Sequence, residues 1–62
     1  MKNIKTMDII KIKSLHNMTI SYKQFEELLL NENVDYIELW KGYNYIVNTI
    51  DGDDFEIYLI ED

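Results

Sequence analysis

The side chains that could support nucleophilic catalysis are the single histidine, His16, and two serines near it, Ser14 and Ser21. A serine is activated only when a histidine accepts its proton and a further group orients that histidine. Ser21 is better explained as a helix cap. A chain of 62 residues also has little room to enclose a substrate cavity of several hundred Å³. We therefore expect no enzymatic activity and no catalytic residue.

An acidic cluster, Asp-Gly-Asp-Asp at residues 51–54, is similar to the start of a calcium-binding loop. The pattern fails further on, because Phe55 and Glu56 stand where the loop requires a ligand and a glycine. The cluster therefore predicts a tight turn and no metal site. The absence of cysteine excludes disulfides and thiolate metal sites, and two glycines cannot form a glycine-rich phosphate loop, so we expect no cofactor.

A helix is predicted from Ser21 onward. Ser21 and Gln24 form a capping box, and Ile20 and Phe25 occupy the positions of a hydrophobic staple. The run Asn31-Glu32-Asn33 should end the helix, because asparagine accepts the left-handed conformation of a C-cap. Apolar residues follow the cap at helical spacing, namely Tyr22, Phe25, Leu28 and Leu29.

Three segments after the helix, residues 34–40, 43–50 and 55–61, are rich in β-branched and aromatic residues and predict strands. Gly42 and Gly52 mark the turns between them. An earlier strand is predicted at residues 7–13, where isoleucines alternate with lysines. The expected fold is a single α+β domain over residues 1–62, with the order β-α-β-β-β and one helix packed on one face of a small, mostly antiparallel sheet.

The expected turns assign the side chains of the last three strands to two faces of the sheet. A two-residue loop at 41–42 and a two- or four-residue loop within 51–54 give the same assignment. The face that should receive the helix is aliphatic, apart from Asn44 and Asn48, and consists of Ile37, Leu39, Ile46, Ile50, Phe55, Ile57 and Leu59. The opposite face consists of Tyr36, Glu38, Trp40, Tyr43, Tyr45, Val47, Thr49, Glu56, Tyr58 and Ile60.

This second face is expected to be open, because one short helix cannot cover both sides of a sheet. Tyrosine and tryptophan are enriched at interfaces, and a contiguous patch of them usually marks a contact surface. Two other interpretations remain: cross-strand pairs that stabilise a solvated sheet, and a homodimer that buries two copies of the face. The predicted partner-binding residues are Tyr36, Glu38, Trp40, Tyr43, Tyr45, Glu56 and Tyr58.

The net charge of −6 is unevenly distributed along the chain. Residues 1–23 contain five lysines and one aspartate, whereas residues 24–62 contain one lysine and eleven carboxylates. The two halves could pair with each other. The acidic half would repel a phosphate chain, so nucleic acid is a disfavoured partner, although a lysine arm at residues 2–13 could serve a nucleic-acid accessory protein. A protein with a basic surface is the favoured partner, because opposite potentials steer association.

The chain lacks arginine and proline and is rich in Ile, Asn and Lys, which is typical of an AT-rich genome such as that of a low-GC bacterium or its phages. Small acidic phage inhibitors of restriction, CRISPR or transcription machinery occupy basic grooves as DNA mimics. The chain is similar to them in size, charge and inferred genome type only. We therefore predict a non-enzymatic phage or mobile-element inhibitor that blocks a host nucleic-acid-binding protein and serves evasion of host defence. The alternative is a small homodimeric structural or assembly protein.

The sequence also predicts a cytoplasmic location in the bacterial host cell. Residues 1–5 are positively charged but are not followed by an apolar run. The longest apolar stretch, residues 28–30, is far shorter than the roughly 20 residues that a membrane helix needs. We therefore expect no association with a membrane.

Overall fold

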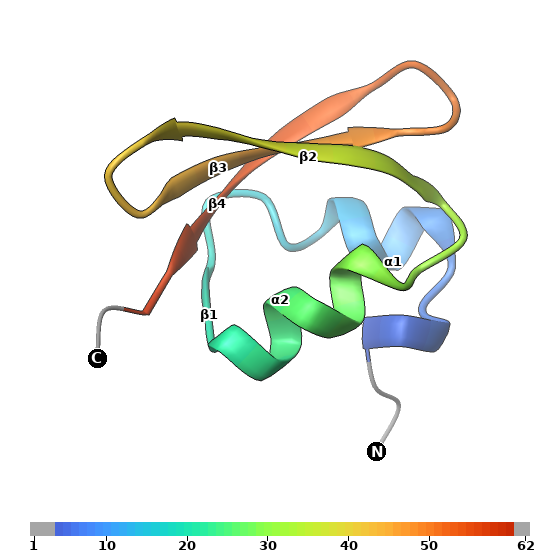
Figure 1. Ribbon diagram of the computed structural model, residues 1–62. Coiled ribbons are helices and arrows are strands. Elements are labelled where there is room, and N and C mark those ends of the chain that lie inside the picture. The colour runs from blue at the N-terminus through green and yellow to red at the C-terminus, as the bar shows by residue number, and fades with distance from the viewer. Residues whose placement is uncertain (1–3, 61–62) are drawn as a thin grey trace.

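The computed structural model describes residues 4–60 and shows two layers, a sheet on one side and helices on the other (Figure 1). Both α-helices and a short 3-10 helix lie against the same face of the sheet. Along the chain the elements are η1 (Ile4–Thr6), α1 (Ile9–Lys13), β1 (Thr19–Ile20), α2 (Tyr22–Leu29), β2 (Val34–Lys41), β3 (Asn44–Thr49) and β4 (Asp54–Leu59).

The sheet has four strands in the order β1-β4-β3-β2. β2, β3 and β4 form an antiparallel meander, and β1 pairs in parallel with β4. The α+β class and the small, mostly antiparallel sheet are therefore confirmed, whereas the first strand is not the predicted one. The last strand of the chain lies in the interior of the sheet, between its first and third strands.

The strand predicted at residues 7–13 is wrong, because most of this segment is the short helix α1. Asp8 caps the helix by accepting a hydrogen bond from the Lys11 N–H at 2.9 Å. Ile12 is fully buried, whereas Ile10 is 78% exposed. Two isoleucines separated by one lysine fit a strand and a single helical turn equally well, so the capping aspartate was the informative signal.

The first strand is instead the two-residue β1, which is supported by backbone bonds on either side of it. Asn17, at a φ of 66°, turns the chain toward β4 and donates its N–H to the carbonyl of Glu56 at 2.6 Å. Further along, Tyr58 donates to the carbonyl of Met18 and Ile60 donates to that of Ile20, each at 2.9 Å. The pairing with β4 therefore extends beyond the two residues of β1.

The capping box of α2 is confirmed. The Ser21 hydroxyl accepts from the Gln24 N–H at 3.1 Å, and the Gln24 side chain accepts from the Ser21 N–H at 2.8 Å. The helix ends just before the run Asn31-Glu32-Asn33, as predicted. The expected left-handed asparagine is wrong, because the C-cap is Leu30, which has right-handed helical dihedral angles.

Asn31 does not cap the helix. Its side chain instead joins the N-terminal segment to the end of α2. The residue is 3% exposed, and its amide nitrogen donates to the carbonyls of Ile4 at 2.8 Å and Met7 at 2.9 Å. Its amide oxygen accepts from the Asn33 N–H at 2.8 Å. One buried side chain thus satisfies three backbone groups.

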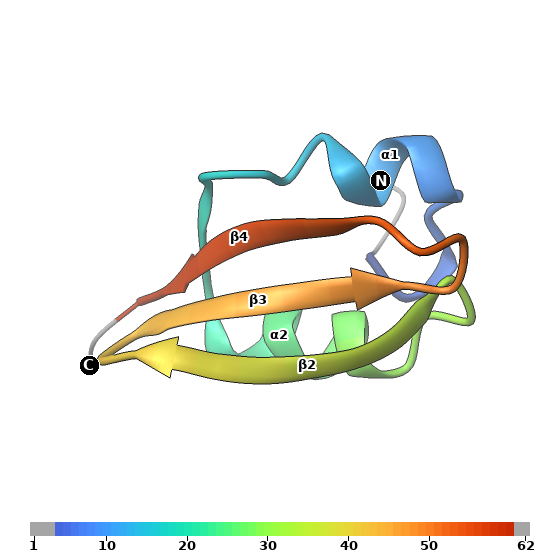
Figure 2. The same cartoon turned by 90° about the horizontal axis from the view of Figure 1, so that it is seen from above.

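The hydrophobic core lies between the two layers. Its most buried members come from the helical layer and from β1, β3 and β4 but not from β2, namely Ile4, Ile12, Leu15, Ile20, Leu28, Val47, Phe55 and Ile57. Because α1 and α2 share one side, the opposite face of the sheet has no covering layer within residues 4–60 (Figures 1 and 2).

The predicted register of β3 is wrong by one residue. Val47 pairs with Ile37 on β2 and with Phe55 on β4, and Tyr45 pairs with Leu39 and Ile57. Tyr45, Val47 and Thr49 therefore face the helices. Asn44, Ile46 and Asn48, which were expected to face the helices, lie on the uncovered side, and Ile50 is exposed in the following loop.

Two irregularities of the strands explain this shift. Between β2 and β3 the pairing slips at Trp40, so that Lys41 pairs with Asn44 and residues 42 and 43 make the turn. Between β3 and β4 the last pair is Asn48 with Asp54, so five residues, 49–53, separate the paired positions. Relative to the predicted loops with an even number of residues, either a bulge or an odd number of loop residues moves every side chain of the strand to the opposite face of the sheet.

Candidate interaction surface

The uncovered side of the sheet, which we call the outer face, is a grid of nine residues from β2, β3 and β4. Figure 2 views it from above, with α2 behind the sheet. Its three cross-strand rows are Tyr36–Asn48–Asp54, Glu38–Ile46–Glu56 and Lys41–Asn44–Tyr58. Tyr36 is 53% exposed and Tyr58 is 38% exposed. Tyrosine rings thus lie at two opposite corners, with carboxylates between them.

Four of the seven predicted partner-binding residues belong to the outer face, namely Tyr36, Glu38, Glu56 and Tyr58. Trp40 and Tyr43 lie beside it at the end of the β2–β3 hairpin, where Trp40 marks the register slip and Tyr43 is in the turn. Both are at least half exposed.

Tyr45 is not part of this surface. Its ring packs against Phe25 of α2, with 4.8 Å between the ring centroids, and it contributes to the edge of the core. The prediction that Tyr45 lies with the other aromatic residues is therefore wrong, and it followed from the incorrect register of β3.

Five outer-face residues were not predicted on this side, namely Lys41, Asn44, Ile46, Asn48 and Asp54. A signal for three of them was present in β3. One alternating set of this strand is Asn-Ile-Asn and the other is Tyr-Val-Thr, and the second contains no side chain as polar as asparagine. Composition alone therefore favoured burial of Tyr45 and Val47.

Hydrogen bonds within the outer face hold the Glu56 carboxylate in place. One of its oxygens accepts from the Asn44 amide and from the Tyr58 hydroxyl, the latter at 3.3 Å. Within the described residues, the Asn44 amide oxygen and the Asn48 amide nitrogen are buried without a hydrogen-bond partner. A buried polar atom without a partner is unfavourable by about 1–3 kcal/mol. A bound group that reached either amide would relieve that cost.

The charges of the two halves of the chain pair at one place. Lys13 of α1 donates to Asp51 at 2.6 Å and to Asp53 at 2.7 Å in the β3–β4 loop. The Lys13 ammonium and the Thr49 hydroxyl lower the pKa of Asp51 to about 2, and the two carboxylates raise the pKa of Lys13. These are the ion pairs found within residues 4–60, so the carboxylates of the outer face are not neutralised.

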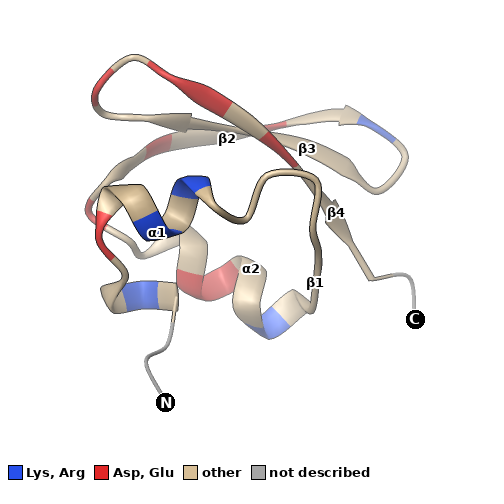
Figure 3. Cartoon of the chain, turned by 180° about the vertical axis from the view of Figure 1, so that it is seen from behind, with Lys and Arg blue, Asp and Glu red and all other residues tan. Residues whose placement is uncertain are grey.

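The remaining charges separate by layer, as Figure 3 shows. Lysines are on η1, α1 and α2, and most acidic residues are on the strands and their loops. The sheet side of the molecule is therefore predominantly negative. Lys41 at the hairpin end is its one basic residue among those described.

The side chains considered for catalysis have structural partners. The His16 ring accepts the Glu56 N–H at 3.1 Å through Nδ1, at the edge of β4. The Ser14 hydroxyl donates to the carbonyl of Lys11, and Ser21 caps α2. The Asp-rich loop holds the Lys13 ammonium. Among the described residues, no three His, Cys, Asp or Glu side chains are placed to hold a metal ion.

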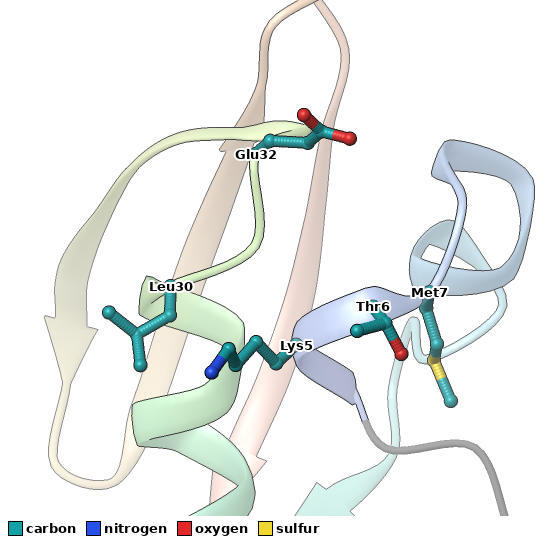
Figure 4. Close-up of a pocket in the computed structure, with 5 residues that line it drawn as sticks. All are labelled: Lys5, Thr6, Met7, Leu30 and Glu32. Atoms are coloured by element: carbon teal, nitrogen blue, oxygen red, sulfur yellow. The ribbon is translucent and has the colours of Figure 1, made fainter.

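A pocket of about 320 Å³ lies away from the outer face, between η1 and the end of α2 (Figure 4). Its lining side chains are few and of mixed character, namely Lys5, Thr6, Met7, Leu30 and Glu32. It does not bring together the residues of a recognisable catalytic or binding arrangement.

The comparisons with known proteins find no match: no protein-family model, no curated protein and no solved structure is similar to this chain. In the part of the chain that the structure describes, no helix has the length and apolar character needed to cross a membrane.

Proposed function

We propose that this protein is a non-enzymatic binding module whose outer face docks on a basic surface of another protein. The observation that carries the proposal is the one-sided covering of the sheet. All described helices lie on one face, and the other presents two partly exposed tyrosines among three carboxylates that have no ion-pair partner within residues 4–60. Opposite potentials accelerate encounter, and buried aromatic side chains then contribute most of the affinity.

The most specific form of the proposal is that the partner is a host nucleic-acid-binding protein. Grooves that bind phosphates are lined with Lys and Arg, and a small acidic domain can occupy such a groove in place of DNA or RNA. We therefore propose a stoichiometric inhibitor of phage or mobile-element origin that acts in the bacterial cytoplasm. Direct binding of nucleic acid is less well supported, because Lys13 is engaged by two aspartates. Lys2 of the expected lysine arm lies outside the described residues.

Affinity capture from the lysate of a low-GC bacterium tests the proposal. The bait is the wild-type protein, with a Tyr36→Ser/Tyr58→Ser double variant as the outer-face test. Tyr22→Ser is the matched control, because Tyr22 is 60% exposed on the helical side. We expect one nucleic-acid-binding protein to be retained by the wild type and by the control and to be lost with the double variant. Retention should weaken as salt rises, since exposed charges are screened.

The captured protein is then purified and titrated. We expect this protein to displace DNA or RNA from it at a one-to-one ratio, and the emission of Trp40, the only tryptophan, to shift as the complex forms. Equal capture by all three baits would contradict docking through the outer face. A concentration-dependent dimer that buries Tyr36 and Tyr58 would show instead that this face is an assembly surface.

A further inference from the structure

The β2 strand is a free edge of the sheet. β2 is the last strand in the sheet order, and no element of the described chain lies along its outer side (Figure 2). An edge strand presents unpaired N–H and C=O groups, which can pair with an extended segment of another chain.

The pairing of the other strands identifies which backbone groups face this edge. Leu59 donates to Tyr43 at 2.8 Å and Thr49 donates to Asp53 at 2.9 Å, so odd-numbered residues of β3 bond toward β4. Backbone groups alternate in direction along a strand, so Ile46 and Asn48 bond toward β2.

The partners of Ile46 and Asn48 on β2 are Glu38 and Tyr36. By the same alternation, the N–H and C=O groups of the intervening residue Ile37, and of the next residue Leu39, point away from β3 toward the free edge. Four backbone groups are therefore available to an added strand.

Irregularities at both ends limit the length of this edge. The β2–β3 register shifts between Val34 and Tyr36 and again between Leu39 and Lys41. Bulges of this kind bend an edge strand and stop the growth of a long ladder. The regular edge is therefore residues 36–39, which suits a short segment of about four to six residues and not the stacking of whole sheets.

The side chains of this edge define the chemistry of the occupant. On the helical side, Leu39 is 60% exposed next to the partly buried Ile37. On the outer face, Glu38 is exposed beside Tyr36. An added strand with apolar and basic residues in alternation would place its apolar side chains against Leu39 and its lysines or arginines beside Glu38.

A second copy of this chain does not meet these requirements. Antiparallel pairing of two β2 strands, with Ile37 of each copy opposite Leu39 of the other, would place the two Glu38 side chains directly opposite one another. Like charges near one another across a strand pair are destabilising, and each copy carries a net charge of −6.

We infer that the partner contributes an extended basic–apolar segment that adds to β2 as a further strand of the sheet, hydrogen-bonded at Ile37 and Leu39. This inference rests on the proposed function and specifies how the partner is held. The partner then meets two adjoining surfaces, the outer face and the free edge, because Tyr36 and Glu38 border both.

Hydrogen exchange with a defined probe tests this inference. The probe is a capped seven-residue peptide of alternating lysine and valine, and the control peptide has the same composition with its lysines in one block. We expect the alternating peptide to slow amide exchange of Ile37 and Leu39 about tenfold at saturation, as one new hydrogen bond at each amide would. The block peptide, which offers equal charge without alternation, should not slow it.

Variants of Leu39 separate the backbone contact from the side-chain contact. Leu39→Pro removes an N–H that points to the free edge and leaves the bonds between β2 and β3 in place. We expect it to weaken binding of the alternating peptide about tenfold, whereas the matched Leu39→Ala keeps the N–H and should weaken it less. Should the proline variant unfold, N-methyl-leucine at position 39 of a synthetic chain removes the same donor.

Unchanged exchange at Ile37 and Leu39, or equal protection by both peptides, would overturn the inference. That result is distinguishable from failure of the proposed function. If Tyr36→Ser/Tyr58→Ser still abolishes capture of the partner while Leu39→Pro does not, the outer face binds the partner without strand addition.

Discussion

At the scale of single residues, Lys13 has a structural role that its position in the sequence did not indicate. It belongs to a lysine-rich segment that could have bound phosphates, yet its ammonium lies between Asp51 and Asp53. The contact joins α1 to the β3–β4 loop. It is solvent-exposed, so its contribution to stability is small and sensitive to salt.

This contact predicts a particular dependence of stability on pH. Lys13 and Thr49 lower the pKa of Asp51 from 3.8 to about 2, so the folded state binds its proton less readily than the unfolded state does. The resulting stabilisation is fully present above pH 3.8 and is lost as the pH falls toward 2. We expect Asp51→Asn to unfold at lower urea concentration than wild type at neutral pH, with the difference shrinking toward pH 2.

The matched control is Asp54→Asn, which removes the same charge at the adjoining start of β4, from a residue that forms no ion pair with Lys13. Its urea midpoint should not follow the same pH profile relative to wild type. Parallel pH curves for wild type and Asp51→Asn would show that the contact with Lys13 does not favour the ionised carboxylate.

At the scale of elements, the fold depends on a joint between the N-terminal segment and the end of α2. Asn31 forms most of this joint, and the Glu27 carboxylate adds a bond by accepting the Ile4 N–H at 3.1 Å. The joint brings Ile4 into the core. Short elements such as η1 and α1 are not stable alone, so they remain folded only because of tertiary contacts such as these.

Asn31→Ala should therefore be severely destabilising. It would remove the shorter hydrogen bond to each of the carbonyls of Ile4 and Met7, and the bond to the Asn33 N–H, at a cost of about 2–4 kcal/mol. A core of this size supplies only ~3–5 kcal/mol in total, so we expect a large unfolded population in water. Urea unfolding followed by circular dichroism measures the change.

Asn33→Ala is the control for this substitution, because its side chain makes a single long contact of 3.4 Å with the carbonyl of Met7. It should cost less than about 1 kcal/mol. A loss for Asn31→Ala no larger than that of Asn33→Ala would contradict the part assigned to the joint.

The elements that the sequence predicted correctly are those with a local physical signature. The capping box predicted the start of α2, and β-branched and aromatic residues predicted the three strands of the meander. The register of β3 depends on a bulge at Trp40 and on a five-residue loop, which propensities do not encode. The resulting error in the predicted register placed Tyr45 on the outer face and Ile46 on the face toward the helices, the reverse of their observed positions.

The apolar pattern of residues 7–13 fits a strand and one turn of helix equally well, so only the cap residue Asp8 indicated α1. The position of β1 was not predictable from local sequence. The two residues of β1 are a strand only because β4, almost forty residues later, offers its edge. Contacts that distant in sequence are decided by tertiary structure and leave little local pattern.

At the scale of the whole molecule, charge and size set the stability. The net charge is −6, and the only described ion pairs are those of Lys13. The folded state therefore brings unpaired carboxylates together on the sheet side. Repulsion of this kind destabilises a compact state and is reduced by salt.

We accordingly expect the protein to become more stable when sodium chloride is raised from 0.01 M to 0.15 M, where the Debye length falls from about 30 Å to about 8 Å. A gain of about 0.5 kcal/mol corresponds to a rise in Tm of ~2–4 °C for a domain of this size. In a Lys13→Met variant, which lacks the favourable pairs that salt weakens, the rise should be larger. A fall in Tm with salt would show that attraction, not repulsion, dominates.

The interior position of β4 determines when the protein can fold during its synthesis. Of the four described strands, the one that is synthesised last is the one that both β1 and β3 require as a neighbour. Until Leu59 has been added, β1 has no partner and the core lacks Phe55 and Ile57. The chain therefore cannot fold stepwise from its N-terminus as it is translated, and cleavage within the last few residues of β4 should abolish the entire fold.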